Sequence, residues 1–226
     1  SDGNPYAVAA NSGDQRWMLN TDGEVSSPAV AEETVFAASA DSTLYAVATE
    51  TGAQRWEVEA GDAIESSPAV ADDTVFVGTT GNTLYAVDAE TGSQRWRFET
   101  DARIFSSPAV EDDTVFVGSD NGTLYAINAA NGADRWTFDT DARIRTSPAV
   151  AGDTVFVGSH DNTLYAVEVE TGDRLWAFDA DASLSSPAVT DDTVFTGSGD
   201  GTLYAVARTS SSGPGLGTID PLAVGG

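Results

Sequence analysis

Three residues of different chemistry occupy the same position in successive segments of the chain. Glu65, Phe105 and Arg145 lie 40 residues apart, and each directly precedes a Ser-Ser-Pro or Thr-Ser-Pro tripeptide. Arg103 and Arg143 lie two residues before the second and third of them. Arginine makes bidentate hydrogen bonds with carboxylates, and an aromatic ring adds an apolar contact. If the fold brings these residues together, they predict a site for a carboxylate-bearing ligand or an acidic loop of a partner.

The alternative interpretation is loop drift: the side chains of these loops vary without a function, and Arg103 and Arg143 pair with the nearby Asp101 and Asp141. His160 is the single histidine of the chain and stands in a turn. We interpret it as incidental, because no second histidine is present for a metal site and no Ser-His-Asp group can be assembled. Cysteine is absent, which excludes thiolate chemistry and disulfides. No catalytic residue and no metal ligand is assigned.

The charge balance is strongly acidic. The chain of 226 residues has 36 Asp and Glu against 10 Arg and no Lys, for a net charge of −26. Such a surface repels phosphates and anionic lipids, so nucleic acid is not an expected partner. No apolar run is long enough to insert into a membrane. Acid in every segment without Lys favours a protein adapted to molar salt, such as one from a halophilic archaeon, with hydrated counterions on its surface.

An internal repeat predicts the strands and loops that carry these residues. The tetrad Ser-Pro-Ala-Val occurs five times at spacings of 40, 40, 40 and 39 residues. Every tyrosine precedes an alanine, and every tryptophan falls at one phase of the repeat. These residues are Tyr6, Tyr45, Tyr85, Tyr125, Tyr165 and Tyr204, and Trp17, Trp56, Trp96, Trp136 and Trp176.

One repeat contains four short runs rich in Val, Phe, Tyr and Ala, separated by turn residues. The runs are 67–70, 74–78, 83–88 and 95–99. Runs of this length and composition predict antiparallel strands, here named A to D from the inner to the outer strand. Four strands in about 40 residues are typical of a propeller blade. The B and C runs are apolar on both faces, as expected for a blade covered by neighbours on both sides.

The stretch Ala86-Val-Asp-Ala-Glu-Thr-Gly-Ser-Gln-Arg-Trp96 resembles the Ala-x-Asp-x-x-Thr-Gly-x-x-x-Trp motif of pyrroloquinoline-quinone (PQQ) type β-propeller repeats. The resemblance extends over residues 1 to about 207, although the last copy lacks its tryptophan. It implies that the five tryptophans dock between blades. The family includes PQQ-dependent dehydrogenases and also propellers that bind no quinone. PQQ with Ca²⁺ is therefore implied by the resemblance alone, and the residues themselves lead us to expect no cofactor.

We expect an all-β propeller of four-stranded antiparallel blades over residues 1–207, followed by a flexible Ser/Gly/Pro-rich tail over 208–226. The N-terminus supplies C and D strands and the C-terminus supplies A, B and C strands. This arrangement favours five blades, with both termini sharing the closing blade. The alternative is an open arc that belongs to a larger ring.

The two faces of this propeller differ in sequence. The face made by A–B and C–D turns repeats the same acidic residues, such as Asp72-Asp73 and Asp112-Asp113, and is interpreted as a solvated surface. The face made by D–A loops and B–C turns varies and carries Glu65, Phe105 and Arg145. We therefore favour a non-catalytic scaffold that binds a protein or peptide on the variable face.

The alternatives are a ligand-sensing domain for a small carboxylate or sugar, and a fragment of a PQQ-dependent dehydrogenase. An enzymatic role is left undecided, with the minimal loops weighing against it. The resemblance favours an extracytoplasmic or cell-surface location. The cytoplasm of a halophile would explain the acidity equally well.

Overall fold

The computed structural model describes residues 4–208, and every regular element among them is a β-strand. The expected tail over 208–226 lies almost wholly outside these described residues. No helix able to cross a membrane is found in the described part of the chain. The strands are β1 Tyr6–Val8, β2 Gln15–Met18, β3 Ala29–Ala31, β4 Thr34–Ala38, β5 Thr43–Ala48, β6 Gln54–Glu59, β7 Ala69–Ala71, β8 Thr74–Gly78, β9 Thr83–Asp88, β10 Gln94–Glu99, β11 Ala109–Glu111, β12 Thr114–Gly118, β13 Thr123–Asn128, β14 Asp134–Asp139, β15 Ala149–Ala151, β16 Thr154–Gly158, β17 Thr163–Glu168, β18 Arg174–Asp179, β19 Ala188–Val189, β20 Thr193–Gly197 and β21 Leu203–Ala207.

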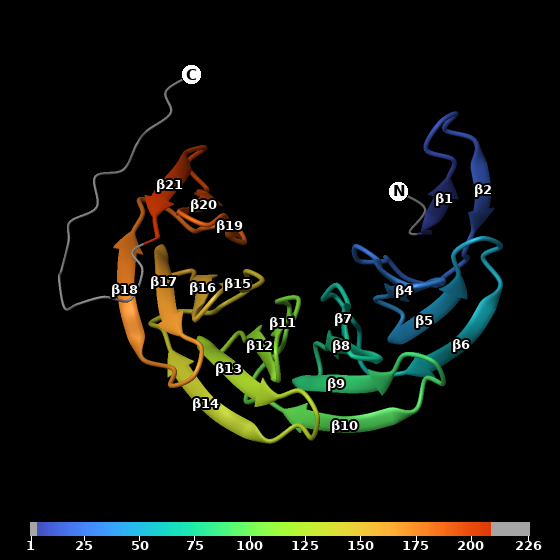
Figure 1. Cartoon of the computed structure of the whole chain (residues 1–226), viewed down its shortest axis with the longest axis horizontal. Helices are drawn as coiled ribbons and strands as arrows, with labels where there is room; N and C mark the ends of the chain where they lie inside the picture. Colours follow the sequence, from blue (N-terminus) through green and yellow to red (C-terminus); the bar gives the residue numbers. More distant parts are fainter. Residues whose placement is uncertain (1–3, 209–226) are drawn as a thin grey trace.

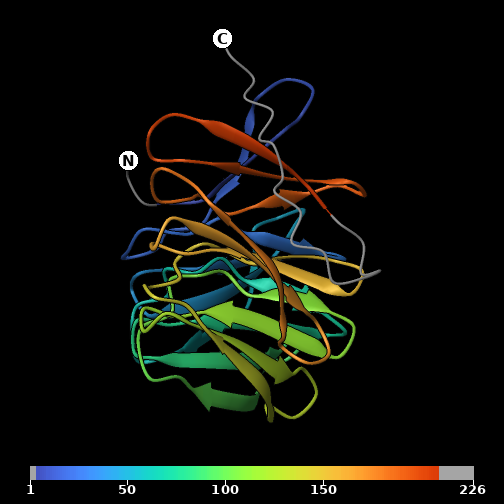
Figure 2. The same cartoon turned by 90° about the vertical axis from the view of Figure 1, so that its left-hand side faces the viewer.

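Four complete blades form the body of the molecule. They are the antiparallel sheets β3–β6, β7–β10, β11–β14 and β15–β18, each with its strands in sequence order. Short A strands line the inner side of the arc and D strands form its rim (Figure 1). Seen from the side, the sheets stack one on another (Figure 2). The propeller of four-stranded antiparallel blades is confirmed.

The strands that remain stand at the two ends of the arc. A two-stranded sheet, β1–β2, precedes the complete blades, and a three-stranded sheet, β19–β21, follows them. The number of sheets fits five blades with the last one divided between the two ends of the chain. Within residues 4–208 the two end sheets are not hydrogen-bonded to each other, and they face each other across the opening of the arc (Figure 1).

Turn chemistry explains why the strands end where they do. In the turn between β7 and β8, Asp72 and Asp73 have φ angles of 43° and 59°. Aspartate tolerates this left-handed region better than most residues with a side chain. Glu32, Asp112 and Gly152 take the left-handed conformation in the corresponding turns, with φ between 48° and 57°. The acidic pairs therefore have a local structural role.

The apolar core lies between neighbouring blades. Phe36, Leu44 and Ile64 pack against Val75 and Val87 of the next blade, and all five are at most 1% exposed. The same contact set recurs at the later blade junctions. Every residue of β8 is buried, as the apolar character of both its faces predicts.

Tryptophan side chains join the blades at the rim. The indole N–H of Trp56 donates to the carbonyl oxygen of Ala89 in the next blade at 3.0 Å. Its ring covers Gly92, where φ is 74° and an added Cβ would lie 2.9 Å from the ring. Glycine is required there by conformation and by space. Trp17, Trp96 and Trp136 make the same hydrogen bond to Thr49, Ala129 and Val169, at 2.9, 2.8 and 2.8 Å.

Candidate functional site

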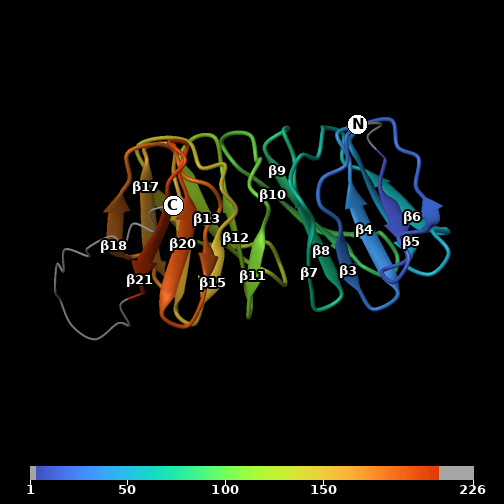
Figure 3. The same cartoon turned by 90° about the horizontal axis from the view of Figure 1, so that it is seen from above.

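The variable face is built on loops that the backbone holds in place. The D–A loop of residues 100–108 is tied to the B–C turns on both sides of it. The amide of Ile104 donates to Thr79 O at 3.0 Å, and the amide of Asp120 donates to Arg103 O at 2.9 Å. The loops of the two faces gather at opposite edges of the arc (Figure 3). Side chains on this loop can therefore vary without loss of the hydrogen bonds that position it.

Arg145 is the centre of the candidate site. Its Nε and Nη2 donate to the two carboxylate oxygens of Asp120 at 2.7 and 2.8 Å. Its guanidinium carbon also lies 4.3 Å from the centroid of the Phe105 ring. These three residues come from two D–A loops and one B–C turn. The structure thus places Arg145 and Phe105 in direct contact.

Charged residues of the neighbouring loops shift the pKa values of Asp120 and Arg145. Hydrogen bonds from Arg145 hold the pKa of the Asp120 carboxyl below its ordinary value of 3.8, against partial burial, and the charges of Arg143 and Arg103 add to the effect. The pKa of Arg145 is raised by its hydrogen bond to Asp120, with a further contribution from the charge of Glu65. Glu65 therefore lies within electrostatic reach of the cluster.

Arg103 and Arg143 are exposed and make no ion pair among residues 4–208. The pairs with Asp101 and Asp141 that loop drift would produce are not formed. The backbone amide of Asp141 instead donates a hydrogen bond to the carboxylate of Asp161, at 3.1 Å. Two guanidinium groups on adjacent loops are thus available to an incoming carboxylate.

Sequence reasoning missed Asp120 as a member of this group. The available signal was its position in a B–C turn where other copies have Ala40, Thr80 and Gly199. Its pairing with Arg145 spans two blades, so repeat alignment alone did not show it. His160 stands at the same turn position, and its pKa is lowered by partial burial and then by the charges of Arg143 and Arg145. Both effects favour the neutral form of the imidazole.

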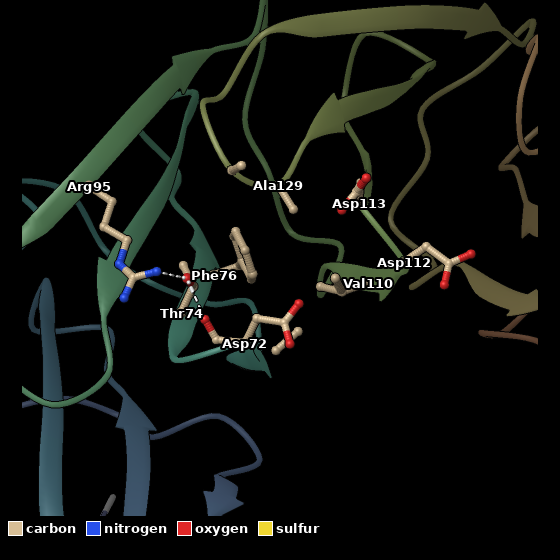
Figure 4. A pocket seen from close by; sticks show the side chains of 10 residues that line it. Asp72, Thr74, Phe76, Arg95, Val110, Asp112, Asp113 and Ala129 are labelled. Carbon is tan, nitrogen blue, oxygen red and sulfur yellow. Dashed lines mark hydrogen bonds between the residues drawn. The ribbon is translucent and has the colours of Figure 1, made fainter.

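The repeating face carries a shallow hollow between the second and third complete blades. Its volume is about 120 Å³, and Asp72, Phe76, Val110 and Asp112 are among the residues that line it. At its border Arg95 donates to the Thr74 hydroxyl at 2.7 Å, as Figure 4 shows. This hollow lies on the opposite face from Arg145. This hollow and the arginine cluster are therefore separate features.

The residues around the hollow do not fit PQQ. The quinone carries three carboxylates, whereas Asp72, Asp112 and Asp113 present carboxylates of their own to the hollow. Groups of three or more side chains suited to a metal are not found in the part of the chain that the structure describes. We therefore derive no chemistry through the quinone.

The chain matches the family model described as outer membrane protein assembly factor BamB, over residues 1–96, 42–117 and 99–213. These matches span most of the sequence, so the chain belongs to this family of PQQ-type repeat propellers. A search of curated proteins returned no match.

Solved structures show the same architecture at low sequence identity. The computationally designed Ika8 protein is 21% identical with a TM-score of 0.81, over 89% of this chain and 64% of that one. BamB from Moraxella catarrhalis is 19% identical with a TM-score of 0.64, over 95% and 81%. The quinohemoprotein alcohol dehydrogenase ADHIIG from Pseudomonas putida HK5 is 18% identical with a TM-score of 0.69, over 83% and 41%. The chain therefore spans less than two thirds of the designed protein, and the similarity shows the fold.

Proposed function

We propose that this propeller is a binding scaffold whose variable face recognises an acidic, carboxylate-bearing segment of a protein partner. One observation carries the proposal: exposed Arg103 and Arg143, without ion pairs in residues 4–208, flank the Arg145–Asp120–Phe105 group. Membership of the BamB-like family supports a protein-interacting scaffold in general.

The three arginines of this cluster have two different roles. Arg145 is already neutralised by Asp120 and stacked on Phe105, so it forms a rigid platform. Arg103 and Arg143 have no ion-pair partner in the described part of the chain, so their guanidinium groups can contact a ligand. In a protein of net charge −26, two such neighbouring cations make this face locally different from the rest of the surface. Direct bidentate contacts of this kind persist in high salt better than long-range attraction does.

The test uses a fluorescein-labelled Glu-Phe-Glu-Glu peptide with a free terminal carboxylate, titrated with protein at ~1 M KCl, where the Debye length is ~3 Å. Saturable anisotropy changes are expected for the wild type and at least about tenfold weaker binding for the Arg103→Ala/Arg143→Ala variant, because each charged hydrogen bond contributes ~1.5 kcal/mol or more. Arg135→Ala is the matched control, since Arg135 is also exposed but stands on the outer strand β14. Equal binding by the double variant, or no binding by the folded wild type, would refute the proposal.

A further inference from the structure

Four of the five tryptophans dock in equivalent positions between sheets, here called tryptophan seats. In each seat the indole packs over the glycine of the C–D turn in the next sheet, and its N–H donates to the residue three positions before that glycine. The seated glycines are Gly52, Gly92, Gly132 and Gly172, and an added Cβ at each would lie 2.7 to 2.9 Å from the indole.

One tryptophan and one seat are left over. Gly13 has the same turn conformation, with φ of 75°, but none of the described residues comes within 4 Å of where its Cβ would be. Trp176 stands on β18, and no acceptor for its indole N–H is found among residues 4–208. By analogy with the four filled seats, the missing acceptor at the Gly13 turn is the carbonyl of Ala10.

The strands at the two ends are complementary in the same way. The hairpin β1–β2 consists of C and D strands, and the sheet β19–β21 consists of A, B and C strands. Together they contain one full blade and one surplus C strand. The two candidates for the C position, β1 and β21, share the sequence Tyr-Ala-Val, at 6–8 and at 204–206. Either strand therefore suits the edge of β20.

Exposed apolar side chains concentrate at these ends. Of six large hydrophobic residues exposed within 4–208, five lie on the end sheets or on β3, the inner strand of the first complete blade. They are Tyr6 at 44%, Val8 at 58%, Met18 at 37%, Val30 at 63% and Leu203 at 56%. In contrast, Leu164, which corresponds to Leu203 in the preceding blade, is 0% exposed. Between interior blades the equivalent positions are buried, whereas at the two ends no other part of residues 4–208 covers them.

We propose that the two ends bind each other between copies of this chain, head to tail. The hairpin β1–β2 of one copy adds to β19–β20 of a second copy in place of β21. The indole of Trp176 from the second copy then covers Gly13 and donates to the carbonyl of Ala10. The product is a complete four-stranded blade shared by two chains, and a contact of this heterologous type continues into rings or filaments.

A second copy fits this role better than the same chain. The junctions between sheets within one chain are nearly identical, because the indole N–H to carbonyl distance is 2.8 to 3.0 Å at four of them. The ends that this stacking produces lie on opposite sides of the opening (Figure 1). Joining them within one chain requires a change at every well-packed junction, whereas a second copy requires only that β21 leave the edge of β20. Because each copy carries a charge of −26, association should strengthen with salt.

Sedimentation velocity over a wide range of protein concentrations in ~1 M KCl tests the proposal, since salt at this level screens the repulsion. Species larger than the 23.4 kDa monomer are expected to increase with concentration. Gly13→Asn should weaken association at least about tenfold, because a side chain occupies the seat while Asn still tolerates a positive φ. Gly61→Asn is the matched control, since Gly61 has φ of 85° and nothing described within 4 Å. A concentration-independent monomer, or normal association of Gly13→Asn, would overturn the proposal.

Disulfide trapping distinguishes closure between copies from closure within one chain. Val206 is directly opposite Val194 in the pairing of β20 with β21, so the exchanged hairpin brings Val8 opposite Val194. The chain has no native cysteine, and directly opposite strand residues are close enough for a disulfide. A mixture of Val8→Cys and Val194→Cys chains should form a two-chain disulfide that neither variant forms alone to the same extent. Absence of this product, or an internally linked monomer of the double variant, would contradict the proposal.

Discussion

The two faces of the propeller use the same four-stranded blades for different purposes. On the repeating face, the C–D turns hold a glycine under a tryptophan ring, and the A–B turns hold acidic residues or glycine at positive φ. On the variable face, main-chain hydrogen bonds such as Asp120 N to Arg103 O position loops whose side chains differ between blades.

This difference shows where side chains are free to change. A turn that depends on a particular side chain, or on the lack of one, must repeat in every blade. A loop held by its backbone leaves its side chains available for recognition, which is the usual relation between a rigid scaffold and functional loops. We therefore expect substitutions on the repeating face to reduce stability, and substitutions on the variable face to reduce binding.

The largest effect is expected for Trp96→Ala. Trp96 is 8% exposed and donates to Ala129 O at 2.8 Å, so truncation removes a large buried ring and leaves a cavity. The free energy of unfolding should fall by about 3–5 kcal/mol, measured by urea denaturation in molar KCl. Trp96→Phe should lose less because it keeps an aromatic ring in the seat. Equal losses for the two variants would contradict the packing argument.

A smaller loss is expected for Gly92→Ala. The added Cβ meets the Trp56 ring at 2.9 Å, and φ at this position is 74°. Overpacking and left-handed strain together should lower the free energy of unfolding by about 2–4 kcal/mol. Gly13→Ala has the same backbone strain without the contact and should cost about 1–2 kcal/mol. If both variants lose the same stability by denaturant unfolding, the tryptophan seat is not a source of stability.

Arg145→Ala should have a modest and pH-dependent effect. The pKa of Asp120 is lowered in the folded state, so the pair stabilises the fold above the ordinary value of 3.8. This stabilisation is lost as the pH falls through the lower folded-state pKa. A partly exposed pair contributes at most about 1 kcal/mol, so the melting temperatures of variant and wild type should differ slightly at pH 7 and converge in acid. A difference that grows in acid would show that another group is responsible.

The smallest effect on stability is expected for Arg143→Ala. This side chain is exposed and forms no ion pair within the described range, so the free energy of unfolding should change by less than about 0.5 kcal/mol. Binding of the acidic peptide should nevertheless weaken several-fold, as measured by anisotropy. If this variant is destabilised but binds the peptide normally, the variable face serves stability and not binding, and the contrast between the two faces is wrong.

Much of the fold could be predicted because its signals are local. The expected run of 74–78 coincides with β8, and the run of 83–88 coincides with β9, since turns and apolar composition mark both ends. Glu65, Phe105 and Arg145 could be singled out because the repeat supplies a reference for each position. Asp120 could not be singled out in this way, because its partner Arg145 lies on the following D–A loop and not at an equivalent position of the repeat.

Sequence patterns alone were sufficient to specify the blade: four strands, their order, the turns between them and the position of the tryptophan in each repeat. These features depend on interactions within about 40 residues, or on copies of the same contact. The three-dimensional arrangement was needed to show that Arg145 pairs with Asp120 and stacks on Phe105, and that within residues 4–208 Trp176 does not cover Gly13. Both outcomes depend on how successive blades are stacked, and that angle arises from packing between sheets, which no single repeat encodes.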